Sequence, residues 1–130
     1  MGANRSMPRA AVIPEPPYAE FRVAAEWLCR AFGFAERLRI GDHRCQLTVE
    51  GRAVVLVAAG DQPSASALLV RLADADSHCA SARRRILREP ADHPHGERQY
   101  SAQDLGGHTW TFSQTVKDVE PAAWGGVLAR

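Results

Sequence analysis

The sequence predicts an α+β protein built from two similar halves, each with a strand, a helix and further strands in that order. Two segments, 19–32 and 75–86, have apolar residues at the spacing of an amphipathic helix. Short runs rich in apolar and β-branched residues lie around both segments and predict strands. The stretch 61–64 separates the halves as a linker, and the order of elements after it repeats the order before it.

The composition excludes several classes of protein. The 130 residues suffice for one hydrophobic core, so one domain is expected. A net charge of +1 gives no overall field for nucleic acid, and no apolar run approaches the roughly 20 residues that cross a membrane. Cys29, Cys45 and Cys79 lie in apolar patterns, which favours buried thiols in a reducing compartment. Since no signal-peptide pattern is visible, we expect a cytoplasmic protein.

The first half is expected to contain a strand, a helix and three strands, in that order, at residues 10–13, 19–32, 35–40, 44–49 and 53–58. Pro14, Pro16 and Pro17 cut the first strand short, because proline cannot donate a ladder hydrogen bond. Gly33 ends the helix, and Glu50-Gly51 forms a hairpin turn between the last two strands.

The second half is expected to contain a strand, a helix and three extended segments, at residues 67–72, 75–86, 88–89, 99–103 and 108–113. Asp74 and Asp76 lie at the start of the helix and three arginines, 83–85, lie near its end, where each sign of charge complements the helix dipole. The arginine triplet is therefore expected on a solvated helix end. A loop over 90–96 and a turn over 104–107 complete this half.

Side chains of catalytic types form no recognisable arrangement. No Ser-His-Asp or Cys-His pairing can be argued, and no glycine-rich loop of the phosphate-binding kind occurs. His93 and His95 with Asp92 lack the fuller ligand set of a zinc site. His43 and His78 are expected on the surface.

Two passages carry a family pattern. The first runs from Ala25 to Phe34 and ends its helix with Phe-Gly-Phe; the second runs from Gly96 to Phe112 and contains Asp104-Leu-Gly-Gly-His. They resemble the glyoxalase, bleomycin-resistance and extradiol-dioxygenase proteins, also called the vicinal oxygen chelate superfamily, and especially its small bacterial glyoxalase-like members. The resemblance covers about residues 10–115.

The resemblance implies two βαββ(β) modules whose curled, mixed or antiparallel sheets form a cleft. Module one would span about 10–60 and module two about 66–115, together one glyoxalase-like domain. Residues 1–9 would be a flexible N-terminus and 116–130 a C-terminal extension. The resemblance also implies a homodimer, with a cleft that lies within one chain or is shared between two.

Metal-using members of the superfamily have four ligands, one on each of four strands that face the cleft. Matched by motif, these positions fall at Ile13, Gln46, Ala67 and Thr111. Three of them lack a usual ligand for a divalent ion, and Gln46 offers only a neutral amide oxygen. We therefore expect no catalytic metal and no cofactor.

Strand alternation and the 90–96 loop give the candidate ligand-binding residues of the cleft: Arg44, Gln46, Leu69, Arg71, His95, Arg98, Tyr100, Thr109 and Thr111. Arg44 and Arg71 would favour an anionic or carbonyl-bearing ligand. An alternative of equal weight is that both arginines simply reach solvent from an open sheet face.

The leading functional hypothesis is a metal-independent protein that binds a small organic molecule, antibiotic-like or bearing a carbonyl or carboxylate group, in its cleft. One alternative is an enzyme of the lyase, isomerase or dioxygenase kind with a non-standard metal site or none. Another is a dimeric scaffold or regulatory module without a ligand. The sequence does not decide among them, and it predicts no catalytic residue.

Overall fold

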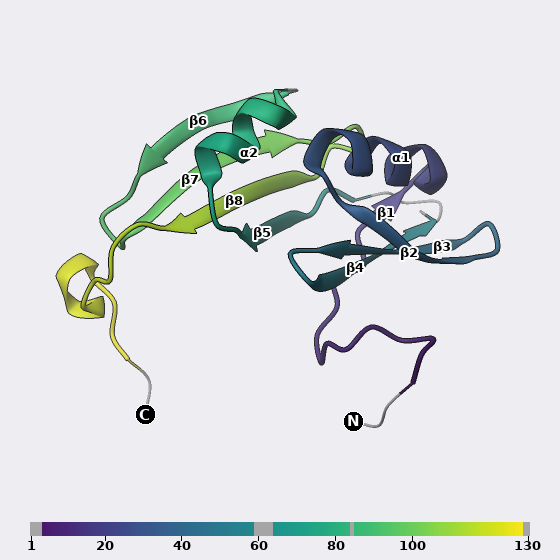
Figure 1. The fold of residues 1–130 in the computed structure, drawn as a ribbon, viewed down its shortest axis with the longest axis horizontal. Helices are drawn as coiled ribbons and strands as arrows, with labels where there is room; N and C mark the ends of the chain where they lie inside the picture. The colour runs from purple at the N-terminus through teal and green to yellow at the C-terminus, as the bar shows by residue number, and fades with distance from the viewer. Residues whose placement is uncertain (1–3, 59–63, 84, 129–130) are drawn as a thin grey trace.

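The computed structural model describes residues 4–58, 64–83 and 85–128, which form two four-stranded sheets with a helix on each (Figure 1). In chain order the elements are β1 (Pro17–Tyr18), α1 (Phe21–Phe32), β2 (Ala35–Ile40), β3 (Arg44–Val49), β4 (Arg52–Ala58), β5 (Ala67–Arg71), α2 (Ala75–Ala82), β6 (Ile86–Asp92), β7 (Glu97–Gln103), β8 (Thr109–Thr115) and a short 3-10 turn, η1 (Pro121–Trp124). Neither helix in the described residues is long and apolar enough to cross a membrane.

The two halves have the same topology. Module one has the strand order β1-β4-β3-β2 and carries α1, and module two has the order β5-β8-β7-β6 and carries α2. In both, the first strand pairs in parallel with the fourth and all other pairs are antiparallel. The predicted α+β class with two mixed sheets is confirmed. The predicted linker over 61–64 lies outside the described residues except for Ser64.

The first predicted strand is wrong. Residues 10–13 form no strand, and sheet pairing begins at β1, where Pro17 lies opposite Val57. The Val57 amide donates to the carbonyl of Pro16 at 3.3 Å. Prolines can occupy this edge because it uses their carbonyl oxygens and needs no N–H from them. The segment before them lies outside the sheet, and its residues 9–12 border the space between the modules.

The second helix is shorter than predicted and the strand after it is longer. α2 ends at Ala82, because Arg83 has φ −29° and ψ 58°, outside the helical region. β6 then runs through Pro90, so the predicted loop over 90–96 is shortened to 93–96. Pro90 is tolerated there because β6 is an edge strand.

The two modules share one aromatic core beneath their helices, which lie side by side on the same side of the sheets (Figure 1). Phe32 and Phe34 of module one meet Trp110 and Phe112 of module two, with ring centroids 5.0 Å apart for Phe32 and Phe112 and 5.2 Å apart for Phe34 and Trp110. Tilted and edge-on contacts of this kind suit the charge distribution of aromatic rings. The contacts fix the position of one module relative to the other.

Asp104 joins the modules through a buried hydrogen-bond network. Its carboxylate is fully buried and accepts from the Trp110 indole at 2.8 Å, from the Gly106 amide at 2.9 Å and from the His108 amide at 3.0 Å. A fourth donor, the Tyr18 hydroxyl, comes from module one. Burial, with the charge of Asp104 and the hydrogen bond to it, raises the pKa of Tyr18 well above its ordinary range.

His108 and Gly106 strengthen the same junction. The Ser66 amide donates to His108 Nδ1 at 2.7 Å, so the neutral imidazole carries its proton on Nε2 and donates to the Pro17 carbonyl, also at 2.7 Å. A Cβ atom on Gly106 would lie 2.7 Å from the ring of Tyr18, so only glycine allows this approach. The Asp-Leu-Gly-Gly-His turn is therefore the contact point between β1 and module two.

His78 forms a second junction, at the C-terminal end of α1. It was expected on the surface, but it is half-buried: its Nε2 lies 2.8 Å from the Phe32 carbonyl and its Nδ1 contacts the Tyr100 hydroxyl. Since a carbonyl only accepts, Nε2 of His78 carries a proton and donates it to the carbonyl of Phe32. Helix α2 thus binds a terminal carbonyl of α1 that has no partner within its own helix.

Candidate ligand-binding cleft

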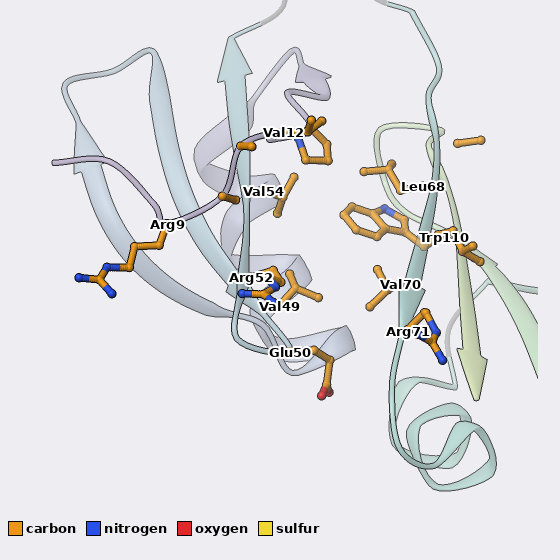
Figure 2. Close-up of a pocket in the computed structure, with 15 residues that line it drawn as sticks. Arg9, Val12, Val49, Glu50, Arg52, Val54, Leu68, Val70, Arg71 and Trp110 are labelled. Carbon is orange, nitrogen blue, oxygen red and sulfur yellow. The ribbon is translucent and has the colours of Figure 1, made fainter. Parts of the chain in front are cut away.

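A cleft of about 830 Å³ lies between the two modules. Figure 2 shows apolar side chains of the two modules facing one another across it, with Val12, Val49 and Val54 on one side and Leu68, Val70 and Trp110 on the other. The first wall comes from the N-terminal segment, β3 and β4, and the second from β5 and β8. The cleft is therefore built by residues far apart in the sequence.

Strand β5 contributes both of its faces to the cleft. Within the described residues it pairs only with β8, so its other edge borders the opening. Leu68 and Val70 are half-buried against the shared core, whereas Leu69, on the opposite face, is 63% exposed. An open strand edge with apolar side chains on both faces offers contact area to a flat, apolar molecule.

Trp110 forms a rigid part of the cleft wall. Only 1% of its surface is exposed, and its indole N–H is held by Asp104. Because the hydrogen bond and the packing against Phe34 and Phe112 restrict its rotation, the ring keeps one orientation. Because so little of the ring is exposed, Trp110 fixes the shape of the wall and offers a ligand little contact area of its own.

The charged residues at the cleft are mainly cationic. Arg9, Arg52 and Arg71 line it, with Glu50 as the one carboxylate among its described lining residues. Arg71 is mostly exposed; its Nη2 donates to the Thr115 hydroxyl at 2.6 Å and its Nε lies 4.0 Å from Glu97.

The pKa of Glu97 is held below its ordinary value by hydrogen bonding with Thr115 and Ser113 and by the charge of Arg71. Glu97 therefore stays ionised at neutral pH and partly balances Arg71. Arg9 and Arg52 have no such partner within the described residues.

Glu50 has an unusual backbone for its residue type. It forms the predicted hairpin turn between β3 and β4 with φ 48°, and Gly51 follows with φ 74°. A turn with two left-handed residues matches the twist of a hairpin, but it favours Asn or Asp at the first position rather than Glu. The turn places Glu50 at the rim of the cleft (Figure 2).

The family's metal-ligand positions do not fit a divalent ion. Ile13 and Ala67 have no ligating atom, and the Thr111 hydroxyl is hydrogen-bonded to Ser101 at 2.8 Å. Gln46 is buried, with its amide oxygen accepting from Arg37 and its amide nitrogen donating to the Ser6 carbonyl at 3.0 Å. Among the described residues, no three His, Cys, Asp or Glu side chains gather as a metal site would require.

Of the nine residues expected to bind a ligand, Leu69 and Arg71 line the cleft. Arg44 instead forms an ion pair with Glu15, and Gln46 lies beneath the N-terminal segment. Thr109 and Thr111 lie on the polar face of the second sheet, away from the helices. These four residues lie away from the cleft because the edges of the two modules border it. The sequence-based prediction had placed the cleft over the polar faces of the sheets.

The other three expected residues lie farther away in module two. Tyr100 points into the core, 1% exposed, because its position on β7 faces α2. His95 packs against Trp124 with ring centroids 5.1 Å apart, and Arg98 forms ion pairs with Asp76 and Asp92. The structure therefore does not bring these three side chains to the cleft.

Sequence reasoning missed most of the cleft's lining. These lining residues have the alternation of core residues: Val49, Val54 and Trp110 are buried, and Leu68 and Val70 are half-buried. Apolar residues have the same spacing along a strand whether they line a cleft or a core, so the spacing does not distinguish the two. The prolines after Val12 were the one usable hint, because they indicate that the preceding segment cannot continue into the sheet.

The chain shares its fold with solved structures of known type. TioX from Micromonospora sp. ML1 is 27% identical, with a TM-score of 0.72 over 85% of this chain and 100% of that one. TnmS3, an antibiotic-binding protein from Streptomyces sp. CB03234, is 24% identical (TM-score 0.68, covering 82% of this chain and 98% of that one). A bleomycin resistance determinant encoded on the transposon Tn5 is 19% identical, with the same TM-score and the same coverage of both chains. No protein-family model and no curated protein sequence matches the chain.

Proposed function

We propose that this chain, which belongs by fold to the glyoxalase and bleomycin-resistance superfamily, binds a small organic molecule in the cleft between its modules. The observation that carries the proposal is the cleft itself. Its volume of about 830 Å³ lies within the range of roughly 300–1,000 Å³ typical of small-molecule sites. Its walls are apolar and aromatic and its rim is charged, which is the usual division between contact area and orientation in such sites.

The shape and charge of the cleft favour a flat apolar molecule with an anionic or carbonyl group. The body of the ligand would contact Val12, Leu68 and Leu69, and its polar group would lie near Arg71. A guanidinium group binds a carboxylate through two parallel hydrogen bonds, so it fixes orientation as well as charge. Exclusion of water from the valine and leucine walls provides most of the binding free energy.

The proposed action is binding without a catalytic metal. TnmS3, whose fold this chain shares, is an antibiotic-binding protein, which supports sequestration of a small molecule as the activity. The residues at the four metal-ligand positions suit hydrogen bonding and packing rather than Lewis-acid chemistry. The homodimer implied by the family resemblance stays a prediction, which light scattering during size-exclusion chromatography measures.

A thermal-shift screen tests the proposal, with aromatic antibiotics, small carboxylates and thiol conjugates as ligands in metal-free buffer. We expect at least one aromatic anion to raise the melting temperature. Leu69→Trp, which adds bulk to an exposed position of the cleft, is expected to weaken that ligand at least tenfold. Val23→Trp is the matched control, since Val23 is also exposed but lies on α1 outside the cleft.

Arg71→Gln is expected to weaken an anionic ligand about tenfold, while Arg44→Gln, whose parent side chain binds Glu15, leaves its affinity unchanged. Stabilisation by no compound in the screen would favour the scaffold hypothesis. One divalent ion per chain in protein purified without added metal would favour the enzyme. Either result contradicts the proposed function.

A further inference from the structure

A second pocket, of about 370 Å³, lies between the N-terminal segment and the sheet of module one. Four arginines line it: Arg5 and Arg9 from the segment, Arg37 from β2 and Arg52 from β4. No aspartate or glutamate is among its described lining residues. The two carboxylates next to lining residues along the chain lie elsewhere: Glu50 lines the cleft, and Glu36 pairs with Arg39.

The four charges are not neutralised within the described residues. The ion-paired arginines lie elsewhere: Arg22, Arg39, Arg44, Arg71, Arg83 and Arg98. The side chains of Arg5, Arg9 and Arg52 make no hydrogen bond with any described residue. Four guanidinium groups around one pocket repel one another, so a bound anion would stabilise the fold there.

The pocket is held together by hydrogen bonds rather than by chance proximity. Arg37 donates to the Gln46 amide oxygen and to two carbonyls of the segment, Arg5 at 2.9 Å and Met7 at 3.3 Å. Gln46 donates in turn to the carbonyl of Ser6 at 3.0 Å. These contacts tie the segment to the sheet and bring its arginines to the same pocket as Arg52.

The arginine pocket adjoins the cleft. Arg9, Ala10 and Arg52 line both, so the two spaces meet along these residues. Figure 2 shows the Arg9 side chain directed away from the apolar walls of the cleft, while Arg52 stands close to Val49. One molecule can therefore place an apolar part between the modules and a charged part among the arginines.

We propose that this pocket, defined by Arg5, Arg9, Arg37 and Arg52, binds a multiply charged oxyanion such as a phosphate or a polycarboxylate group. Guanidinium groups match the planar, bidentate geometry of such anions, and several of them favour a dianion over a single carboxylate. The anion site rests on the arginines alone. Its link to the cleft, through one ligand that occupies both, rests on the proposed function.

Calorimetric titration with inorganic pyrophosphate tests the site, in metal-free buffer at 0.15 M total ionic strength, with citrate in parallel to distinguish phosphate from carboxylate. The site predicts saturable binding of one anion per chain, weakened at least tenfold in Arg9→Gln/Arg52→Gln. Arg30→Gln/Arg88→Gln is the matched control, because these arginines are exposed and lie outside both the arginine pocket and the cleft. Circular dichroism checks that each variant is folded.

The inference is overturned if neither pyrophosphate nor citrate binds saturably. It is also overturned if the two double variants bind the anion with equal affinity. Should Arg9→Gln/Arg52→Gln not fold, the single Arg9→Gln variant decides by the same tenfold criterion. Leu69→Trp separates this inference from the proposed function. This variant is expected to bind pyrophosphate as the unmodified chain does while losing the aromatic ligand. If the unmodified chain binds the aromatic ligand but not pyrophosphate, the arginine site alone is overturned.

Discussion

Replacing Asp104 by asparagine tests how the two modules are joined. The asparagine amide oxygen can still accept from the backbone amides of Gly106 and His108. Its NH₂ group then faces the Tyr18 hydroxyl and the Trp110 indole, which both donate to the aspartate. The hydroxyl can rotate and accept, but the indole N–H only donates, so one buried donor loses its partner.

The magnitude follows from the hydrogen bonds that each variant loses and from the buried donors that it leaves unpaired. A buried donor without a partner costs about 1–3 kcal/mol, and the charge of the acceptor strengthens each lost bond, so we expect Asp104→Asn to lower the free energy of unfolding by about 2 kcal/mol. Asp104→Ala unpairs all four donors and is expected to cost about 4 kcal/mol. Tyr18→Phe removes one donor and leaves three, for about 1 kcal/mol.

Urea denaturation followed by circular dichroism measures the three variants. The expected order of destabilisation is Asp104→Ala, then Asp104→Asn, then Tyr18→Phe. An Asp104→Asn variant within about 0.5 kcal/mol of the unmodified chain would contradict the role of Asp104 as the acceptor of four buried hydrogen bonds, since surface substitutions have effects of that size. So would an Asp104→Ala variant that costs no more than Tyr18→Phe.

Three further predictions follow from single residues. Glu50→Asn is expected to raise the free energy of unfolding by about 1 kcal/mol, because Asn tolerates the left-handed backbone that Glu50 adopts. Urea denaturation measures this change, and an unchanged free energy of unfolding would contradict the assigned turn. Burial raises the pKa of both Tyr18 and Tyr100, so above pH 10 unfolded tyrosines ionise while the folded ones stay neutral, and stability falls with rising pH by up to about 1.4 kcal/mol per pH unit for each tyrosine. Ultraviolet titration should therefore show both tyrosines ionising only as the chain unfolds, and early ionisation of either contradicts its burial. Burial, together with the hydrogen bond to Glu36 and its charge, raises the pKa of Cys45 to about 12, so at pH 8 about one thiol in ten thousand is ionised. Mass spectrometry after treatment with an alkylating reagent should therefore find Cys45 unmodified in the folded protein. Rapid alkylation of Cys45 would contradict this environment.

The sequence predicts most of the fold because local signals and packing agree over most of the chain. β2 and β3 begin and end where periodicity places them, and the Glu50-Gly51 turn forms as expected. The first strand failed because residues 10–13 have the composition of a strand, while the strand edge beside β4 is occupied by the prolines that follow. Which segment pairs with that edge depends on where β4 lies in the folded chain, and local composition does not contain this information.

The site was predicted less well than the fold. Alternation correctly separated the apolar and polar faces of β3, but polarity does not say which face or edge borders an opening. Gln46 shows the difficulty: it lies on the polar face as expected, yet the N-terminal segment covers it. Arg9 and Arg52 were not candidates, because their convergence depends on how that segment folds back onto the sheet.

The most direct test of ligand binding between the modules uses Trp110 as a reporter. Trp27 and Trp124 are replaced by phenylalanine, which leaves Trp110, on the cleft wall, as the one tryptophan of the chain. The ligand that stabilises the protein most in the thermal-shift screen is then titrated while tryptophan emission is recorded. We expect a saturable change in tryptophan emission with the dissociation constant that calorimetry gives. Saturable binding by calorimetry with unchanged Trp110 emission would place the ligand elsewhere and contradict binding between the modules.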